Sequence, residues 1–405
     1  MILTLKKYSP YQVAIFLSAS SMGFGLFREF LIVGLLGFSA QNDLLQAYLS
    51  IFYTIGLTID AMKLACLNLY SEITLSSMLI SASLICLPFC MIVTCIMGHM
   101  IHQENMTLLI TTMLGGYFNL IAALLITYKQ RNNVFLPAQV INVIPNFILI
   151  PGILMCYYST ETHMISAIII LTAIIPIVQC IALFMLPTAA SQKTLHNKFN
   201  LIQGCMTFIR HFFSMLGEQG FQMIARSAFY NYGTGYLSIF AISVRVYTAL
   251  KFILIDSYIG SKLFDWKKSL APTSYIHKMI SSNLFASILA ITALAITLRV
   301  NHLFLFSVVQ LSLLLVLGFY FSTRVRVLYF KINRYHNSAS LVLRYALFEL
   351  LFAFFAFAMT LFSHYPIFTL LWIGYIAKPF TQILLLRKSD QTISLNPEEP
   401  QWQIS

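Results

Sequence analysis

Twelve long apolar runs constrain what this chain of 405 residues can fold into. A helix that crosses the hydrocarbon core of a bilayer needs about 20 predominantly apolar residues, and each run is long enough for one. The chain is 59% hydrophobic and 9% charged, and the polar stretches between the runs are too short to bury a core of their own. The sequence therefore predicts an all-α polytopic membrane protein with about twelve transmembrane helices. The predicted helices cover residues 11–38, 44–70, 73–97, 106–128, 135–157, 164–186, 201–228, 236–259, 276–298, 303–321, 341–362 and 365–386.

The basic residues give these helices an orientation. Lys and Arg gather in every second loop, for example Lys129 and Arg131 after the fourth run and Lys193 and Lys198 after the sixth. Cytoplasmic loops carry such an excess, so we expect both termini to be cytoplasmic. Basic residues beside helix ends meet anionic lipid, which accounts for most of the net charge of +12. We therefore expect membrane lipids as partners and no nucleic acid.

The most polar internal stretch, residues 187–200, separates the sixth and seventh runs. It predicts an N-terminal six-helix lobe (1–186), a cytoplasmic linker (187–200) and a C-terminal six-helix lobe (201–388). An even number of helices in each half gives both halves the same orientation, so any structural repeat would be a parallel one. Residues 389–405 are polar and include two prolines, which predicts a cytoplasmic disordered tail.

The first run carries two charged side chains, Arg28 and Glu29, in its middle. An ionised side chain at bilayer depth is costly, so such residues face a partner or a watery cavity and mark functional sites. Neighbouring residues on a helix point about 100° apart. We therefore expect that Arg28 and Glu29 do not pair with each other, and that each finds a partner elsewhere or one of them faces solvent.

The seventh run carries a polar stripe. Its members recur every four residues, which places them along one face of a helix. They are Arg210, Ser214, Glu218, Gln222 and Arg226. Two interpretations stay open: the stripe lines a cavity, or it forms a hydrogen-bonded seam between packed helices.

A third intramembrane arginine, Arg245, lies in the eighth run with no acidic residue within one helical turn. The guanidinium fork can bind two phosphate oxygens at once and keeps its charge. A site that brings Arg28, Arg226 and Arg245 together would therefore favour a diphosphate.

Sequence patterns typical of catalysis or metal binding are absent. The chain has no HExxH, no GxxxxGK and no GxSxG arrangement. Its seven cysteines lie inside apolar runs and lack the CxxC or Cys/His spacing of metal sites. We therefore expect no catalytic residues, metal ions or cofactors.

Two stretches resemble one family of transporters. The first run matches a pattern of the form SRxxGFxRDxxxAxxFG at Ser21, Gly25, Arg28 and Gly37, with Glu29 in place of the aspartate. Asp43 follows it, as an aspartate does in the family's second helix. Residues 218–247 resemble the family's seventh and eighth helices, with Gln219, Gly235 and Arg245 on its glutamine, glycine and arginine. The family is the lipid II flippases (MviN/MurJ-like) of the multidrug/oligosaccharidyl-lipid/polysaccharide exporter superfamily.

The resemblance implies two six-helix lobes that form a V around a central cavity, which opens alternately to each side of a bacterial inner (cytoplasmic) membrane. The cargo it implies is an undecaprenyl-diphosphate-linked oligosaccharide, either a polysaccharide repeat unit or a lipid II-like precursor. Met22 stands where the family has an arginine, and the arginines of the family's second helix are absent. These departures favour the polysaccharide repeat unit.

The resemblance also assigns residues. It implies that Arg28 and Arg245 bind the diphosphate with help from Arg226. Glu29, Asp43 and Glu218 would set the charge of the cavity, and the expected substrate-binding set is completed by Gln219 and Gln222. A coupling cation, Na⁺ or H⁺, is compatible with the family and is not identified by the sequence. Polysaccharide polymerase or glycosyltransferase machinery would be partners of a protein that acts as a monomer.

Two other functions stay open from the sequence. A cation-coupled multidrug exporter of the same superfamily would share the architecture, although its cavity should be acidic where this one is basic. A membrane polysaccharide polymerase would also have many helices, but such enzymes carry a long periplasmic loop, and the outward loops here are short.

Overall fold

The structure is a computed structural model in which every regular element of the described residues is helical. It describes residues 10–56, 58–59, 75–131, 135–159, 163–186, 205–206, 208–209, 216–251, 318, 321, 325, 339–362 and 373–395. The chain divides into two compact units, Met1–Arg245 and Val246–Ser405. The predicted lobes, 1–186 and 201–388, remain a prediction because the linker between them and much of the second lobe lie outside the described residues.

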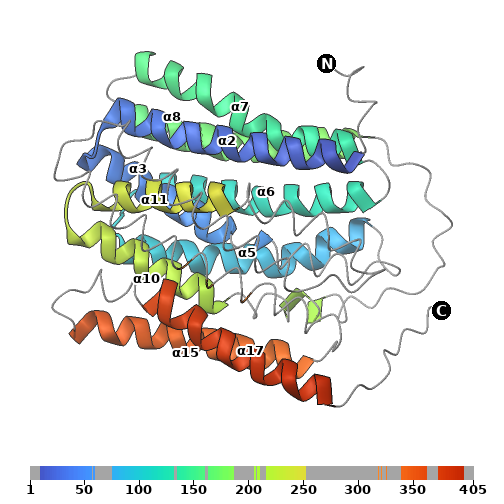
Figure 1. The fold of residues 1–405 in the computed structure, drawn as a ribbon. Helices are drawn as coiled ribbons and strands as arrows, with labels where there is room; N and C mark the ends of the chain where they lie inside the picture. The colour runs from blue at the N-terminus through green and yellow to red at the C-terminus, as the bar shows by residue number, and fades with distance from the viewer. Residues whose placement is uncertain are drawn as a thin grey trace. The chain divides into compact units, whose positions relative to one another are not determined.

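The helices of the first unit lie alongside one another (Figure 1). They are α2 (Pro10–Leu36), α3 (Ala40–Gly56), α5 (Leu75–Met100), α6 (Met106–Arg131), α7 (Phe135–Ser159), α8 (Met164–Met185), α10 (Leu216–Tyr232) and α11 (Tyr236–Lys251), the last of which continues past Arg245. The second unit contains α15 (Ala339–Phe362), the π-helical turn η2 (Ile373–Ala377) and α17 (Lys378–Leu395). The runs predicted at 276–298 and 303–321 lie outside the described residues, apart from isolated positions.

Four of the described helices are long and apolar enough to cross a membrane. Their spans are Leu75–Met100, Met106–Lys129, Val140–Tyr158 and Met164–Met185. They match four of the predicted runs closely. The described residues therefore have the composition and helix length of a multi-pass membrane protein.

Helix α6 is central to the first unit, where it contacts α3, α5, α7 and α8. A Cβ atom on Gly115 would lie 2.8 Å from the Cα of Ala173 in α8, and one on Gly116 would lie 2.7 Å from Cδ1 of Ile55 in α3. Two consecutive glycines therefore allow the α6 backbone to approach both neighbours, as small residues do between membrane helices. Accordingly 61% of the α6 span is buried, against 11% of the α7 span.

Proline in a helix leaves a carbonyl group without its usual donor. Pro145 of α7 has no N–H for the carbonyl of Ile141, and Gln179 of α8 donates its side-chain N–H to that oxygen at 3.0 Å. The next residue, Asn146, donates to the carbonyl and the hydroxyl of Ser21 in α2 at 3.1 and 2.8 Å. Polar side chains thus replace the hydrogen bond that the proline removes, and they join α7 to α8 and α2.

The C-terminal end of α6 extends further than the sequence predicted. Lys129, predicted to lie in a loop, is buried in the last turn of α6 and donates to the carbonyl of Leu186, just beyond the end of α8. A cation at a helix C-terminus is stabilising.

Helix α17 continues to Leu395, so it includes residues 389–395, the first seven of the predicted disordered tail. Those seven contain no glycine or proline, and Pro397 follows shortly after, at a place where helices usually end.

Candidate functional site

Glu29 of α2 lies at the centre of a buried polar cluster. Only 1% of its side chain is exposed. Its Oε1 accepts hydrogen bonds from Arg28 Nη2 at 2.8 Å and from the Tyr53 hydroxyl at 2.9 Å, and its Oε2 accepts one from Gln46 Nε2 at 3.0 Å. A buried carboxylate is tolerated only when it is paired and hydrogen-bonded in this way. Tyr53 and Gln46 belong to α3, so the cluster joins α2 to α3.

The expectation that Arg28 and Glu29 would not pair is wrong. Arg28 Nη2 donates at 2.8 Å both to Glu29 Oε1 and to the Tyr53 hydroxyl. The angle between neighbours on a helix separates the Cβ atoms, but both of these side chains are long and flexible. They meet at the phenol of Tyr53, which lies between them and completes a triangle of hydrogen bonds.

Arg226 and Arg245, from α10 and α11, reach the same tyrosine. The guanidinium carbon of Arg245 lies 3.8 Å from the centroid of the Tyr53 ring, and its Nε is 3.6 Å from Glu29 Oε1. The guanidinium carbon of Arg226 lies 5.5 Å from the same centroid, and its Nη1 donates to the Ser50 hydroxyl of α3 at 3.0 Å. Cations are attracted to the faces of aromatic rings at these distances. The structure therefore brings together the three arginines that the sequence singled out.

Two of the guanidinium groups in this cluster share one carboxylate. Arg28 and Arg245 both contact Oε1 of Glu29, at 2.8 and 3.6 Å, whereas Arg226 donates to Ser50 and lies over the Tyr53 ring. Arginine remains charged in proteins, and buried charge is costly unless it is paired. Arg245, with 26% of its side chain exposed, is more accessible than Arg28, with 9%. The arrangement is suited to an anion with several oxygens that would approach past Arg245.

Asp43 of α3 is close in sequence to this cluster but has other partners. Its carboxylate accepts hydrogen bonds from the backbone N–H of Gly235, from the Ser238 N–H at 2.9 Å and from the Ser238 hydroxyl at 2.6 Å. These donors are the first turn of α11 and the residue before it. Gly235 has a φ of +88°, a backbone conformation that residues other than glycine rarely adopt. Asp43 thus caps the N-terminus of α11, where a negative charge is stabilising.

The remaining predicted site residues lie on α10. Gln219 and Gln222 are 1% and 7% exposed, and they share a helical face with Arg226, which contacts α3. Among the described residues, neither amide atom of Gln219 has a hydrogen-bond partner. The side chain of Glu218 is outside the described part, as are Arg210 and Ser214. Of the stripe's described members, Arg226 joins α10 to α3 through its hydrogen bond to Ser50.

Sequence reasoning missed the α3 side of the site. Gln46, Ser50 and Thr54 are buried and follow one another every four residues, so they form a polar stripe of their own. Tyr53 adjoins this stripe. The members of this stripe are uncharged, so the cost of burying charge does not single them out as it does the arginines. Within the described part of the chain, no three His, Cys, Asp or Glu residues are grouped to hold a metal ion.

Comparisons with known proteins give little more. No protein-family model matches the chain. No curated protein sequence matches it either. One solved structure with a similar arrangement of helices is the inward-facing conformation of a multidrug resistance MATE family transporter of the MOP superfamily, at 10% identity, 96% coverage of both chains and a TM-score of 0.48. A likeness at this level does not place the chain in a family.

Proposed function

We propose that this protein is a flippase that moves an undecaprenyl-diphosphate-linked oligosaccharide from the cytoplasmic to the periplasmic leaflet of a bacterial inner membrane by alternating access. The observation that carries the proposal is the convergence of Arg28, Arg226 and Arg245 around Tyr53, with Glu29 as the carboxylate partner of Arg28 and Arg245. A diphosphate offers several anionic oxygens to guanidinium forks. The glycan would be a polysaccharide repeat unit or a lipid II-like precursor.

Glu29 has a defined part in this proposal. Its carboxylate forms ion pairs with the guanidinium groups of Arg28 and Arg245, which limits the free-energy cost of burying these charges. A bound diphosphate competes with Glu29 for the same donors. Translocation then needs no covalent chemistry, only a difference in binding free energy between two conformations of the protein.

Hydrogen bonds between α10 or α11 and the earlier helices support an alternating mechanism. Besides the Asp43 cap, Ser227 and Asn231 both donate to the Met100 carbonyl, at 3.0 and 3.1 Å, and Gln103 donates to the Tyr230 hydroxyl at 2.9 Å. In the predicted topology these helix ends face the periplasm. We infer that this arrangement is closed on that side and that the same bonds break when the periplasmic side opens.

The proposal is tested by replacing the cluster arginines. We expect Arg28→Ala and Arg245→Ala each to abolish export of the envelope glycan while the protein still reaches the membrane, because each change removes a ligand of the diphosphate. The measurements are the amount of surface glycan and the amount of protein in isolated membranes. Arg131→Ala, at the end of α6 and outside the cluster, is the control and should export normally. Normal export by both cluster variants would disprove the arginine site.

A cation-coupled multidrug exporter is the second candidate. The buried carboxylate of Glu29 and the ring faces of Tyr53 and Phe240 are groups that bind organic cations. In the described structure, however, those groups already hold arginines. A deletion strain separates the two functions. A flippase mutant accumulates a lipid-linked glycan in the inner leaflet, whereas an exporter mutant becomes drug-sensitive with a normal envelope glycan.

A further inference from the structure

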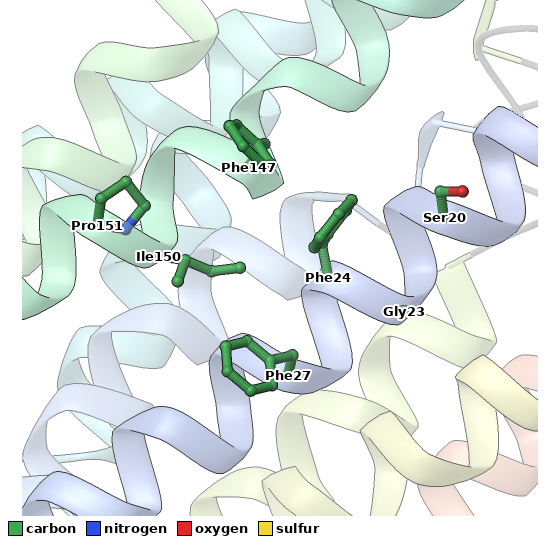
Figure 2. Close-up of a pocket in the computed structure, with 7 residues that line it drawn as sticks. All are labelled: Ser20, Gly23, Phe24, Phe27, Phe147, Ile150 and Pro151. Carbon is green, nitrogen blue, oxygen red and sulfur yellow. The ribbon is translucent and has the colours of Figure 1, made fainter. Parts of the chain in front are cut away.

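An apolar groove runs between α2 and α7, apart from the arginine cluster. Its volume is about 720 Å³, within the range of small-molecule pockets. Figure 2 shows its lining, which contains three phenylalanines and no charged side chain: Ser20, Gly23, Phe24 and Phe27 from α2, and Phe147, Ile150 and Pro151 from α7. Phe24 and Phe147 meet edge to face with ring centroids 5.6 Å apart.

Gly23 leaves the α2 side of the groove open. A Cβ atom added there would meet nothing within 4 Å, so the space beside the α2 backbone is empty. The rims are open, since Phe27 is 55% and Phe147 61% exposed. A chain-like apolar ligand can therefore enter from the lipid side without displacing a buried residue.

The groove lies close to the arginine cluster along α2. Phe24 and Phe27 precede Arg28 by four residues and one residue on the same helix. At a rise of about 1.5 Å per residue, Phe24 lies roughly one helical turn from Arg28 along the axis. A ligand with an anionic head and an apolar chain joined to it could thus occupy both places at once.

We propose that the α2–α7 groove holds the first part of the polyprenyl chain of the carrier lipid whose diphosphate binds the arginine cluster, an inference that rests on the proposed function. Ordinary phospholipid chains compete for the groove, but a chain tethered to a bound diphosphate is present at a high effective concentration. The phenylalanine faces give contact area to the methyl branches of such a chain. The groove thereby distinguishes the carrier lipid from water-soluble diphosphates.

Two glycines of α2 provide a matched pair of variants. Gly23→Leu fills the groove. Gly34→Leu is the control, because Gly34 lies on the same helix but does not line the groove. A Cβ atom added at Gly34 also meets nothing within 4 Å. Leucine is a better helix former than glycine, so both variants should fold. Thermal unfolding in nanodiscs checks that they do.

The experiment measures binding of undecaprenyl diphosphate and of inorganic pyrophosphate to protein in nanodiscs. We expect Gly23→Leu to weaken undecaprenyl diphosphate binding about tenfold, the order expected for steric discrimination in an apolar pocket, and to leave pyrophosphate binding unchanged. Gly34→Leu should change neither. If Gly23→Leu binds undecaprenyl diphosphate as the wild type does, the groove proposal is wrong. If instead the wild type fails to bind both ligands, or Arg28→Ala and Arg245→Ala bind both normally, the proposed function is wrong.

A labelling experiment identifies the occupant directly. A photoreactive group near the head of the undecaprenyl chain should label residues 147–151 of α7, and excess unlabelled undecaprenyl diphosphate should suppress the labelling. A phosphatidylcholine probe with the same group serves as the comparison. If the phosphatidylcholine probe labels the groove and undecaprenyl diphosphate does not suppress that labelling, the occupant is ordinary membrane lipid. That result would overturn the proposal.

Discussion

Replacing Asp43 by asparagine tests whether this carboxylate is a structural cap. Its oxygens accept from three donors of α11. Asparagine is nearly the same size but has one acceptor oxygen, and its NH₂ group would face a backbone N–H. Hydrogen bonds to a charged group contribute about 1.5–3 kcal/mol each, and the favourable interaction with the helix N-terminus adds about 0.3–1 kcal/mol. We therefore expect Asp43→Asn to lower the free energy of unfolding by about 2–4 kcal/mol.

The assay is reversible denaturation in mixed micelles, followed by circular dichroism, with a double-mutant cycle that includes Ser238→Ala. Because the Ser238 hydroxyl donates to Asp43 at 2.6 Å, the two changes should couple by more than about 0.5 kcal/mol. Amide hydrogen exchange at the start of α11 should accelerate in Asp43→Asn. Glu104→Gln, which removes an exposed carboxylate, is the control and should have little effect. Additive costs in the cycle, or unchanged exchange at Gly235 and Ser238, would refute the capping argument.

Three further variants probe other contacts. Gly115→Ala should destabilise the protein by about 1–3 kcal/mol because its Cβ has no room against α8, whereas Gly34→Ala should be neutral or slightly stabilising; thermal unfolding of both compares them. Tyr53→Phe should cost about 1–3 kcal/mol, measured by denaturation, because the phenol links two charged side chains. Lys378→Ala should cost about 1–3 kcal/mol, because the buried Glu349 carboxylate loses the ammonium 3.2 Å away and keeps the Gln382 amide that donates to it at 2.6 Å. A double-mutant cycle of Lys378→Ala with Glu349→Gln, which keeps an acceptor for the Gln382 amide, should show coupling above about 0.5 kcal/mol, and additive costs would contradict the ion-pair explanation.

Helix positions were the part of the fold most accessible to sequence reasoning. The runs predicted at 106–128 and 164–186 correspond closely to α6 and α8, because length and apolar composition decide whether a helix can span a bilayer. What composition could not predict was the order of burial. Helix α6 is central because Gly115 and Gly116 allow close approach, and α7, equally apolar, is mostly at the surface.

The candidate site was only partly predictable. The cost of burying charge pointed to Arg28, Arg226 and Arg245, and the structure brings these three together. The pairing of Arg28 with Glu29 was predicted wrongly because the prediction used the direction of each Cβ and not the reach of the side chains. Tyr53 was missed because an uncharged aromatic residue in an apolar helix does not look unusual until its partners are known.

Arg28 and Arg245 share the single carboxylate of Glu29, and this has an electrical consequence in the proposed cycle. Moving one elementary charge through the whole membrane field changes the free energy by about 2.3 kcal/mol per 100 mV. These three side chains carry a net positive charge through part of that field whenever they change sides without cargo. A bound diphosphate, which carries more than one negative charge, reverses the sign of the charge that moves. The voltage across the membrane would then act in opposite directions on the loaded and the unloaded half of the cycle.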